Sequence, residues 1–455
     1  MEFTEEFLYH IWDAQHLNNK LETKSGKKLN IKFSGRWNTD SGPDFKDSII
    51  VIEDEVKRGD VEIDLTSYQW KSHSHNENPE FNQVLLHVIY ENQGNNPYTI
   101  SEDGTKIEIL EIKDQLDVDI SKLLKQYSNK SYSEKDKFCK LFDNLNSKET
   151  ADTLLKMGMI RFEKKIKRFK AEHYFNDYDQ LLYSGIMEAL GYSKNKFHML
   201  QFAMDLPYKD LQEFYAKGMS KDEMTAILIC SSNLIETLPK MISDELKNTW
   251  QNMYLNQKYM KKTITKRWNM FRIRPVNHPA VRLLQITDLL YKSLKTSLFH
   301  NSLKLFSFPS DVFKLSDFKR KLYKFFQTES HLLQKNYKLG KTRIDTILIN
   351  ILLPITIIYA REKRYEKLEN AILEVYRDFP ALPANNLTNY MGKFMDDKQK
   401  KLINKKAVFQ QGLLNIYFSN CQHHYCDACV SSTKYNLYEM IESKKGRMII
   451  LPLIC

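Results

Sequence analysis

The spacing of apolar residues changes near residue 118, and this change constrains the fold more than any other feature of the sequence. Before it, short runs rich in Val and Ile are separated by Gly, Asp and Asn, as strands are. They cover residues 29–35, 48–53, 59–65 and 84–91, with shorter runs at 98–100 and 107–110. Beyond it, apolar residues recur at spacings of three and four, as in helices. The sequence therefore predicts an α+β chain.

Three regions follow from this pattern. We expect a mixed α/β domain over residues 1–118, a large, mostly α-helical domain over 119–400, and a short Cys-rich segment over 401–455. A helix over residues 4–17 opens the first domain, because Thr4 can serve as its N-cap and the following apolar residues share one face. These residues are Phe7, Leu8, Ile11 and Trp12.

The composition is typical of a soluble protein, with 42% hydrophobic and 27% charged residues. The acidic, amphipathic N-terminus lacks the pattern of a signal peptide. The longest apolar stretch, residues 346–360, is shorter than a membrane span and is interrupted by Asn350 and Pro354. We therefore expect a buried core helix at this stretch, a cytoplasmic location and no membrane partner.

The formal net charge of +11 fits a nucleic-acid partner, and it fits equally a Lys-rich chain without one. Basic residues cluster at 156–170, at 261–274 around Trp268 and Phe271, and at 318–326. Basic side chains with interleaved aromatic rings suit a phosphate backbone and stacked bases. The alternative is a set of solvated helix faces whose aromatic residues belong to the core.

Carboxylates alternate along "GDVEIDL" (59–65). The period of a strand places Asp60, Glu62 and Asp64 on one face, where like charges repel unless the face is solvated or binds a cation. A hairpin that turns near 53–58 would bring Asp44, in "NTDSGPDF", beside Glu62. Hard oxygen ligands of this kind suit Mg²⁺ or Mn²⁺. The alternative is a turn-forming loop beside a solvated acidic face.

This order of elements resembles the core of the PD-(D/E)XK nuclease superfamily. It comprises a helix, Pro43-Asp44 at the start of a strand, Glu62-x-Asp64 on the next strand, and then a loop and a buried strand. The resemblance implies a restriction-endonuclease-like domain that hydrolyses phosphodiester bonds. It also implies that Asp44 and Glu62 hold a divalent metal, which activates water and stabilises the phosphorane-like transition state.

The sequence departs from the superfamily at the usual lysine position, which Asp64 occupies. A carboxylate cannot supply the positive charge of a lysine, so Asp64 would be a third metal ligand or would position the water. Lys46 or Lys71 would then supply the charge and contact the phosphate. If the lost lysine marks lost chemistry, the protein is instead a non-catalytic nucleic-acid- or protein-binding scaffold.

Histidines follow the acidic strand. His73 and His75, with His87 on the next strand, could form a metal site with Glu62, contact phosphate or act as a general acid. The alternative, which we favour over a zinc site, is a polar loop with two exposed histidines and a core His87 held by a backbone hydrogen bond.

A cysteine cluster lies near the C-terminus, in "NCQHHYCDACVSS". Cys421, Cys426 and Cys429 have a spacing that can hold Zn²⁺ or an iron–sulfur cluster. The fourth ligand would be His424, or one of His423, Cys139 and Cys455. Some nucleases of the superfamily above carry a cysteine-bound iron–sulfur cluster that staples the domain. A metal here would be structural, since the protein supplies all candidate ligands and no open position is evident. The alternative is a group of reduced thiols without a metal.

Over nearly its whole length the chain resembles a family of uncharacterised bacterial proteins known as a domain of unknown function. The resemblance rests on "NTDSGPDF", "GDVEIDL", "LLHVIYE", "GIMEALGYSKNK", "RIRPVNHP", "KTRIDTILINILLP" and the terminal cysteine spacing. It implies membership of that family and no particular activity.

Overall fold

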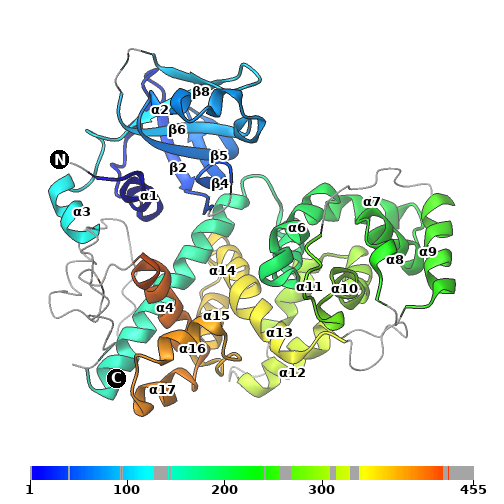
Figure 1. The fold of residues 1–455 in the computed structure, drawn as a ribbon. Coiled ribbons are helices and arrows are strands. Elements are labelled where there is room, and N and C mark those ends of the chain that lie inside the picture. Colours follow the sequence, from blue (N-terminus) through cyan, green and yellow to red (C-terminus); the bar gives the residue numbers. More distant parts are fainter. Residues whose placement is uncertain are drawn as a thin grey trace. The chain divides into compact units, whose positions relative to one another are not determined.

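The computed structural model describes most of the chain. The described residues are 3–38, 41–92, 94, 96–127, 142, 145–239, 242–256, 268–307, 314–327, 338–423 and 429. The chain forms two compact units, with unit 1 comprising residues 1–161, 384–403 and 409–455, and unit 2 comprising 162–383 and 404–408. An N-terminal mixed sheet is followed by a mostly helical region (Figure 1), which confirms the α+β class.

Unit 1 begins with helix α1 (Glu5–Ala14) and a mixed eight-stranded sheet, drawn in blue in Figure 1. The strands are β1 (Leu21–Glu22), β2 (Lys28–Phe33), β3 (Arg36–Trp37), β4 (Phe45–Ile52), β5 (Glu55–Thr66), β6 (Val84–Glu91), β7 (Tyr98–Ile100) and β8 (Lys106–Glu111). Their order is β1-β2-β4-β5-β6-β8-β7, and β3 pairs with β4. Antiparallel pairing joins β1, β2, β4 and β5, whereas β5, β6 and β8 run parallel.

The hairpin of β4 and β5 has an irregular register that matters for the acidic residues. Its turn lies at Glu53 and Asp54, within the region where the sequence predicts one. Phe45 pairs with Val61 but Ser48 pairs with Gly59, so β4 contains one extra residue. Asp47, in this bulge, has a φ of 57°. The bulge sets the register that places Asp44 beside Glu62.

Helix α1 covers one face of the sheet and packs against β5. Phe7, Leu8, Ile11 and Trp12 are buried in a core with residues of the strands, which confirms the predicted apolar face. The helix ends at Ala14 rather than at residue 17, since Gln15 adopts a left-handed conformation. Thr4 occupies the N-cap position, but its side chain makes no capping hydrogen bond.

Unit 1 also contains a second, helical core. Its helices include α4 (Ser147–Glu172), whose last turns belong to unit 2, α16 (Asn386–Gly392), α17 (Asp397–Ile403) and most of α18 (Ala407–Ser419). Short helices α2 (Gln69–Ser72) and α3 (Ile120–Tyr127) accompany the sheet in the chain order. The core buries side chains such as Leu154, Met391 and Leu413.

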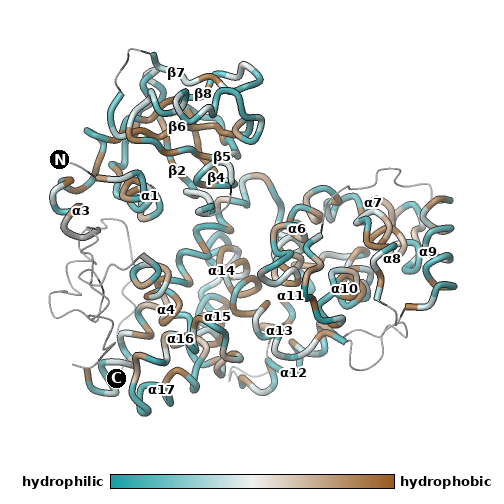
Figure 2. Tube along the Cα trace, viewed as in Figure 1, coloured by the Kyte–Doolittle hydropathy of each residue, from teal (hydrophilic) through white to brown (hydrophobic). Residues whose placement is uncertain are grey.

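Among the described residues, the regular elements of unit 2 are helices. Its remaining helices are α5 (Tyr178–Leu190), α6 (Tyr192–Asp205), α7 (Tyr208–Ala216), α8 (Lys221–Ser231), α9 (Asp244–Asn256), α10 (Pro279–Leu294), α11 (Leu298–Leu303), α12 (Leu315–Phe325), α13 (Lys341–Ile347), α14 (Leu353–Glu362) and α15 (Glu366–Asp378). Apolar residues are frequent along the strands of the sheet and along α10 (Figure 2).

The predicted core helix at 346–360 is part of a longer one. Helices α13 and α14 join through a π-helical turn at Leu348–Leu352 into a continuous helix, Lys341–Glu362, of 22 residues. Asn350 and Pro354 do not interrupt it, because the π turn accommodates the proline that follows. By length and composition this helix could cross a membrane, but 72% of its most apolar window is buried within the protein, as in a core helix.

Candidate metal centre

The β4–β5 hairpin and the loop before β6 bring carboxylates and histidines together. Asp44 immediately precedes β4, and Glu62 and Asp64 lie on β5. Glu62 and Asp64 are only 6% and 1% exposed. This burial excludes a solvated acidic face, one of the two alternatives that the sequence leaves open.

Asp44 and Glu62 are held side by side by main-chain groups. The amide of Asp44 donates to Oε2 of Glu62 at 3.1 Å, and the amide of Ile63 donates to Oδ2 of Asp44 at 2.9 Å. The hydroxyl of Tyr9, on α1, lies close enough to Asp44 to lower the pKa of this carboxyl group against the effect of burial. These contacts fix the carboxylates from the backbone of the hairpin and from the helix above it.

Asp64 is oriented by a buried histidine. Its Oδ2 lies 3.0 Å from Nε2 of His87, and Nδ1 of His87 lies 2.8 Å from the hydroxyl of Thr99 on β7. An ionised Asp64 accepts from Nε2–H, which leaves Nδ1 of a neutral imidazole to accept from Thr99. His87 is therefore a core histidine, as predicted. The prediction that a backbone hydrogen bond holds it is wrong, because its partners are the side chains of Asp64 and Thr99.

Two further histidines enter from the loop between α2 and β6. Nδ1 of His73 lies 3.3 Å from Oδ1 of Asp64, and Nε2 of His75 lies 2.9 Å from Oε1 of Glu62. The second contact is not directed as a hydrogen bond. The prediction of two exposed histidines is wrong for His75, whose side chain is 12% exposed, whereas His73 is 41% exposed.

The spacing of these atoms fits a shared cation. Asp64, His73 and His75 each offer one ligand atom, and the three atoms lie within 4.8 Å of one another. Two ligands bound at right angles at about 2.1 Å from a metal are about 3 Å apart. The distance of 2.9 Å between Nε2 of His75 and Oε1 of Glu62 matches this separation.

Burial and mutual repulsion raise the pKa values of the carboxyl groups of Asp44 and Glu62. Burial, followed by the charge of Glu62, raises the pKa of Asp44 to about 8. Burial, followed by the charge of Asp64, raises the pKa of Glu62 to about 8. Burial lowers the pKa of His75, so its imidazole is neutral at neutral pH and can serve as a ligand. Without a cation, the ionised forms of Asp44 and Glu62 are therefore electrostatically unfavourable.

Asp60 is paired with Lys46, one of the two candidate lysines. Oδ2 of Asp60 accepts from Nζ of Lys46 at 2.9 Å, and Oδ1 accepts from the amide of Asp47. Lys46 therefore neutralises Asp60, although its charge also lowers the pKa of Glu62 slightly against the effect of burial. Lys71 is exposed on α2. Its ion pairing with a phosphate stays a prediction.

Sequence reasoning missed the contribution of α1. Glu5 accepts a hydrogen bond of 2.5 Å from Gln69, and burial followed by the charge of Asp64 raises its pKa. Glu5 and Tyr9 are four residues apart, so they share the side of α1 that faces the acidic residues. That spacing is the only signal in the sequence, and it has meaning only once the helix is known to cover this part of the hairpin.

The cysteine prediction falls mostly outside the described residues. Cys421 is half-buried and packs against the helical core of unit 1, and Cys429 is buried within that core. Cys426, His424, Cys139 and Cys455 lie outside the described residues. A structural Zn²⁺ or iron–sulfur site therefore stays a prediction.

Some basic side chains of the three predicted clusters bond within the protein and are therefore occupied by other side chains. In 156–170, Arg161 donates to Gln411, and Arg168 is held between Glu172 and Glu188. On α12, Phe318 and Leu322 are buried, as expected for a helix with a solvated basic face. Of the 261–274 stretch the structure describes only residues 268–274, where Phe271 is 69% exposed.

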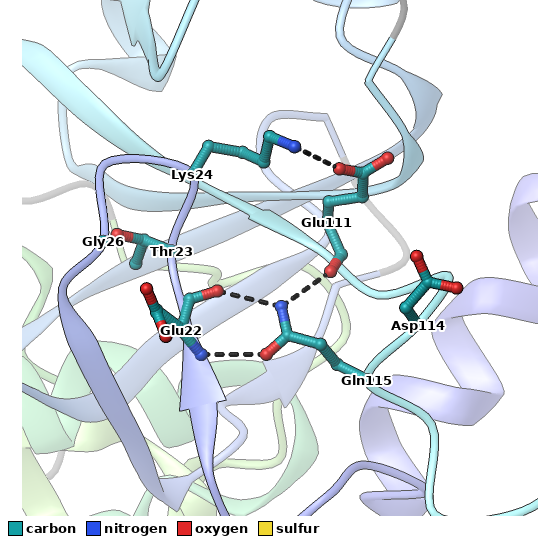
Figure 3. Close-up of a pocket in the computed structure, with 7 residues that line it drawn as sticks. All are labelled: Glu22, Thr23, Lys24, Gly26, Glu111, Asp114 and Gln115. Atoms are coloured by element: carbon teal, nitrogen blue, oxygen red, sulfur yellow. Dashed lines mark hydrogen bonds and ion pairs between the residues drawn. The ribbon is translucent and has the colours of Figure 1, made fainter.

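A separate pocket of about 260 Å³ lies on the sheet domain (Figure 3). The side chain of Gln115 bonds to both backbone groups of Glu22 and to the carbonyl of Glu111, and Lys24 pairs with the Glu111 carboxylate. These polar groups satisfy one another and tie β1 to the end of β8. The pocket shares no residue with the acidic cluster.

The fold and the cluster define an α+β protein with a carboxylate–histidine site in its N-terminal sheet. The chain belongs to the family described as "Protein of unknown function (DUF2851)", whose model matches residues 5–385. The matched range includes every residue of the cluster and ends before the cysteine-rich segment. No curated protein and no solved structure matches the chain.

Proposed function

We propose that the protein is a divalent-metal-dependent nuclease that hydrolyses phosphodiester bonds. The observation that carries the proposal is the convergence of Asp44, Glu62 and Asp64 with His73 and His75. Among the described residues, no lysine or arginine forms an ion pair with these three carboxylates. A divalent cation would supply the missing positive charge.

The donor set indicates which metals fit. Carboxylate oxygens suit Mg²⁺ and Mn²⁺, and the neighbouring imidazole nitrogens favour Mn²⁺ over Mg²⁺. Such an ion, when bound, would polarise a phosphoryl oxygen and lower the pKa of a bound water. Asp44, Glu62 and Asp64 would hold it, and His87 would keep Asp64 oriented toward it, as partners of metal-bound carboxylates do.

The order of elements supports a relation to PD-(D/E)XK nucleases. A helix precedes an antiparallel hairpin that carries Asp44 and Glu62, and a parallel strand, β6, follows after a loop. Asp64 occupies the position of the usual lysine. We assign the phosphate-binding role of that lysine to His73, since the imidazole of His73 is the most exposed side chain of the cluster and lies beside Asp64. The net charge of +11 fits a nucleic-acid substrate.

One observation favours the second candidate, a non-catalytic nucleic-acid-binding scaffold. Lys46, a candidate replacement for the missing lysine, already forms an ion pair with Asp60. If His73 cannot take over the part of the lysine, the site would bind metal and nucleic acid without cleaving it.

The test compares cleavage and metal binding in the same variants. Labelled single- and double-stranded DNA and RNA are incubated with Mn²⁺ and wild type, Glu62→Gln or Glu55→Gln. Glu55 lies on the same strand but is 73% exposed, so it serves as the control. We expect Glu62→Gln to lose Mn²⁺ binding by calorimetry and at least about 100-fold of cleavage, as with loss of a metal-orienting contact.

Circular dichroism establishes that each variant is folded. Cleavage by wild type and Glu55→Gln alone assigns hydrolysis to the cluster. If wild type binds Mn²⁺ and oligonucleotide but cleaves no substrate, the scaffold replaces the nuclease. If neither Mn²⁺ nor Mg²⁺ binds, the metal site itself is wrong.

A further inference from the structure

Two arginines in unit 2 meet at one tyrosine without a carboxylate. The guanidinium carbon of Arg343, on α13, lies 3.2 Å from the ring centroid of Tyr192, and that of Arg282, on α10, lies 4.7 Å from it. Neither arginine forms an ion pair within the described part of the chain. By contrast, Arg168 and Arg361 in the same unit each bind two glutamates.

Arg282 is held by neutral acceptors only. It is 3% exposed and donates to the hydroxyl of Tyr192 at 2.6 Å, to Oε1 of Gln285 at 2.6 Å and to Oδ1 of Asn277 at 2.5 Å. Its Nε is buried and makes no hydrogen bond. Neutral oxygens orient a guanidinium without cancelling its charge, so Arg282 is a buried cation that lacks compensation.

Arg343 brings a second positive charge to the same ring. It is half-buried, beside the exposed Lys341 and Thr342, and donates to the carbonyl of Ala189 at 3.2 Å. Burial lowers the pKa of Arg343 to about 10; Tyr192 opposes this shift, and the charge of Arg282 adds a smaller lowering effect. An arginine with this pKa is charged at neutral pH, and Arg282 lies close enough for its charge to disfavour the charge of Arg343.

The backbone around Tyr192 is built to hold this arrangement. Tyr192 itself has a φ of 53°, a conformation that costs energy in any residue but glycine. A Cβ on the preceding Gly191 would lie 2.2 Å from the carbonyl oxygen of Asn195, so only glycine fits the junction of α5 and α6. Strain of this kind persists where the surrounding structure requires a side chain at one place.

We propose that Arg282 and Arg343, arranged around Tyr192, form a binding site for a phosphate group. A phosphate would neutralise both buried charges and accept paired hydrogen bonds from the planar guanidinium of Arg343, which stacking on Tyr192 holds in one orientation. The site lies in unit 2, whereas the proposed metal centre lies in unit 1. The proposed phosphate site is additional to hydrolysis at the metal centre, and the proposal does not depend on that activity.

A neighbouring aromatic residue indicates the source of the phosphate. Phe271 is 69% exposed, with Nζ of Lys194 at 5.5 Å and the guanidinium carbon of Arg272 at 4.9 Å from its ring. Lys194 lies two residues after Tyr192 on α6, and it donates to the carbonyl of Phe271. An exposed ring flanked by cations suits an unpaired base, so single-stranded nucleic acid is the favoured source over free phosphate.

The first test measures the Tm with inorganic phosphate against chloride at equal ionic strength. We expect phosphate to raise the Tm of wild type. Arg343→Gln should remove this shift and should leave the Tm in phosphate-free buffer unchanged or higher, because it relieves repulsion of Arg282. Arg361→Gln is the matched control, since it breaks ion pairs with Glu163 and Glu369 and should lower the Tm while keeping the phosphate shift.

The second test measures the anisotropy of a labelled single-stranded oligodeoxynucleotide in EDTA, so that a failure of the metal centre cannot affect it. Binding about tenfold weaker in Arg343→Gln, and weaker in Phe271→Ala, supports a nucleic-acid phosphate. A phosphate shift without any change in oligonucleotide binding supports the same site with free phosphate as its ligand. No phosphate shift in wild type, together with unchanged oligonucleotide binding in Arg343→Gln, overturns the proposal.

Discussion

At the scale of single residues, neighbours decide what each carboxylate can do. Asp60 and Glu62 are two residues apart on β5, yet Lys46 pairs with Asp60, whereas Glu62 lies among other acids. The same contrast appears among the arginines of unit 2, where Arg168 has two carboxylate partners and Arg282 has neutral ones. In both proposed sites, ionisable side chains are therefore buried without an ion pair to a lysine, arginine or carboxylate among the described residues.

The raised pKa values of Asp44 and Glu62 predict a pH dependence of stability. Their ordinary values are 3.8 and 4.5, and in the fold both are raised to about 8. Between these limits the unfolded chain binds fewer protons than the folded protein, so the metal-free protein loses stability as the pH rises. Urea unfolding in EDTA at several pH values measures this slope, which Glu62→Gln should flatten. An equal slope in the variant would contradict the assignment.

The same protons compete with the metal. Because Mn²⁺ must displace protons from Asp44 or Glu62 below pH 8, we expect its affinity to rise about tenfold per pH unit between pH 6 and 8 for each proton released. Calorimetry in buffers of different ionisation enthalpy counts the protons. An affinity independent of pH would mean that the metal binds elsewhere.

At the scale of elements, single irregularities set the geometry. One extra residue in β4 brings Asp44 beside Glu62. In unit 2, α5 approaches the π-helical turn at Leu348–Leu352 closely enough that Gly185 is required, because a Cβ there would lie 2.4 Å from Cγ2 of Ile351. The buried helix Lys341–Glu362 therefore packs so closely on α5 that a larger side chain at position 185 would clash with Ile351.

This contact predicts a stability loss. Gly185→Ala should destabilise the protein by about 1–3 kcal/mol through overpacking against Ile351. Gly392→Ala on α16 is the control, since nothing lies within 4 Å of its added Cβ, and it should be neutral or slightly stabilising. Urea denaturation midpoints compare the two. Equal midpoints would mean that the helices separate without cost.

At the scale of the whole molecule, the chain carries its two candidate sites on two units. The metal centre belongs to the sheet of unit 1, and the arginine–tyrosine site belongs to the helices of unit 2. The two proposals can therefore be separated by where a ligand stabilises the protein.

Hydrogen exchange measured by mass spectrometry makes this separation. We expect Mn²⁺ to slow exchange in β4 and β5, where the amide of Ile63 bonds to Asp44, and to leave α10 and α13 unchanged. Phosphate should slow exchange around α6, α10 and α13 and leave the hairpin unchanged. Protection of the same segments by both ligands would contradict two separate sites.

The sequence by itself determined the classes of element and several of their places. Strand-like runs predict β2, β4, β5 and β6, and the apolar face of α1 is buried as its spacing requires. These features are local, because the period of apolar residues reflects the geometry of one element. The acidic residues Asp44, Glu62 and Asp64 were also recognisable, since a hairpin is the shortest way to join two neighbouring strands.

Only the tertiary structure decided which polar groups meet. No local pattern places Tyr9 against Asp44, or Arg282 and Arg343 on Tyr192, since these partners come from elements that are distant in the chain. Tyr192 and Arg343 lie in two separate motifs of the sequence, and Asn277, which accepts from Arg282, lies in a third. Charge compensation depends on distances in space, so buried cations and anions without partners become visible only after the chain has folded.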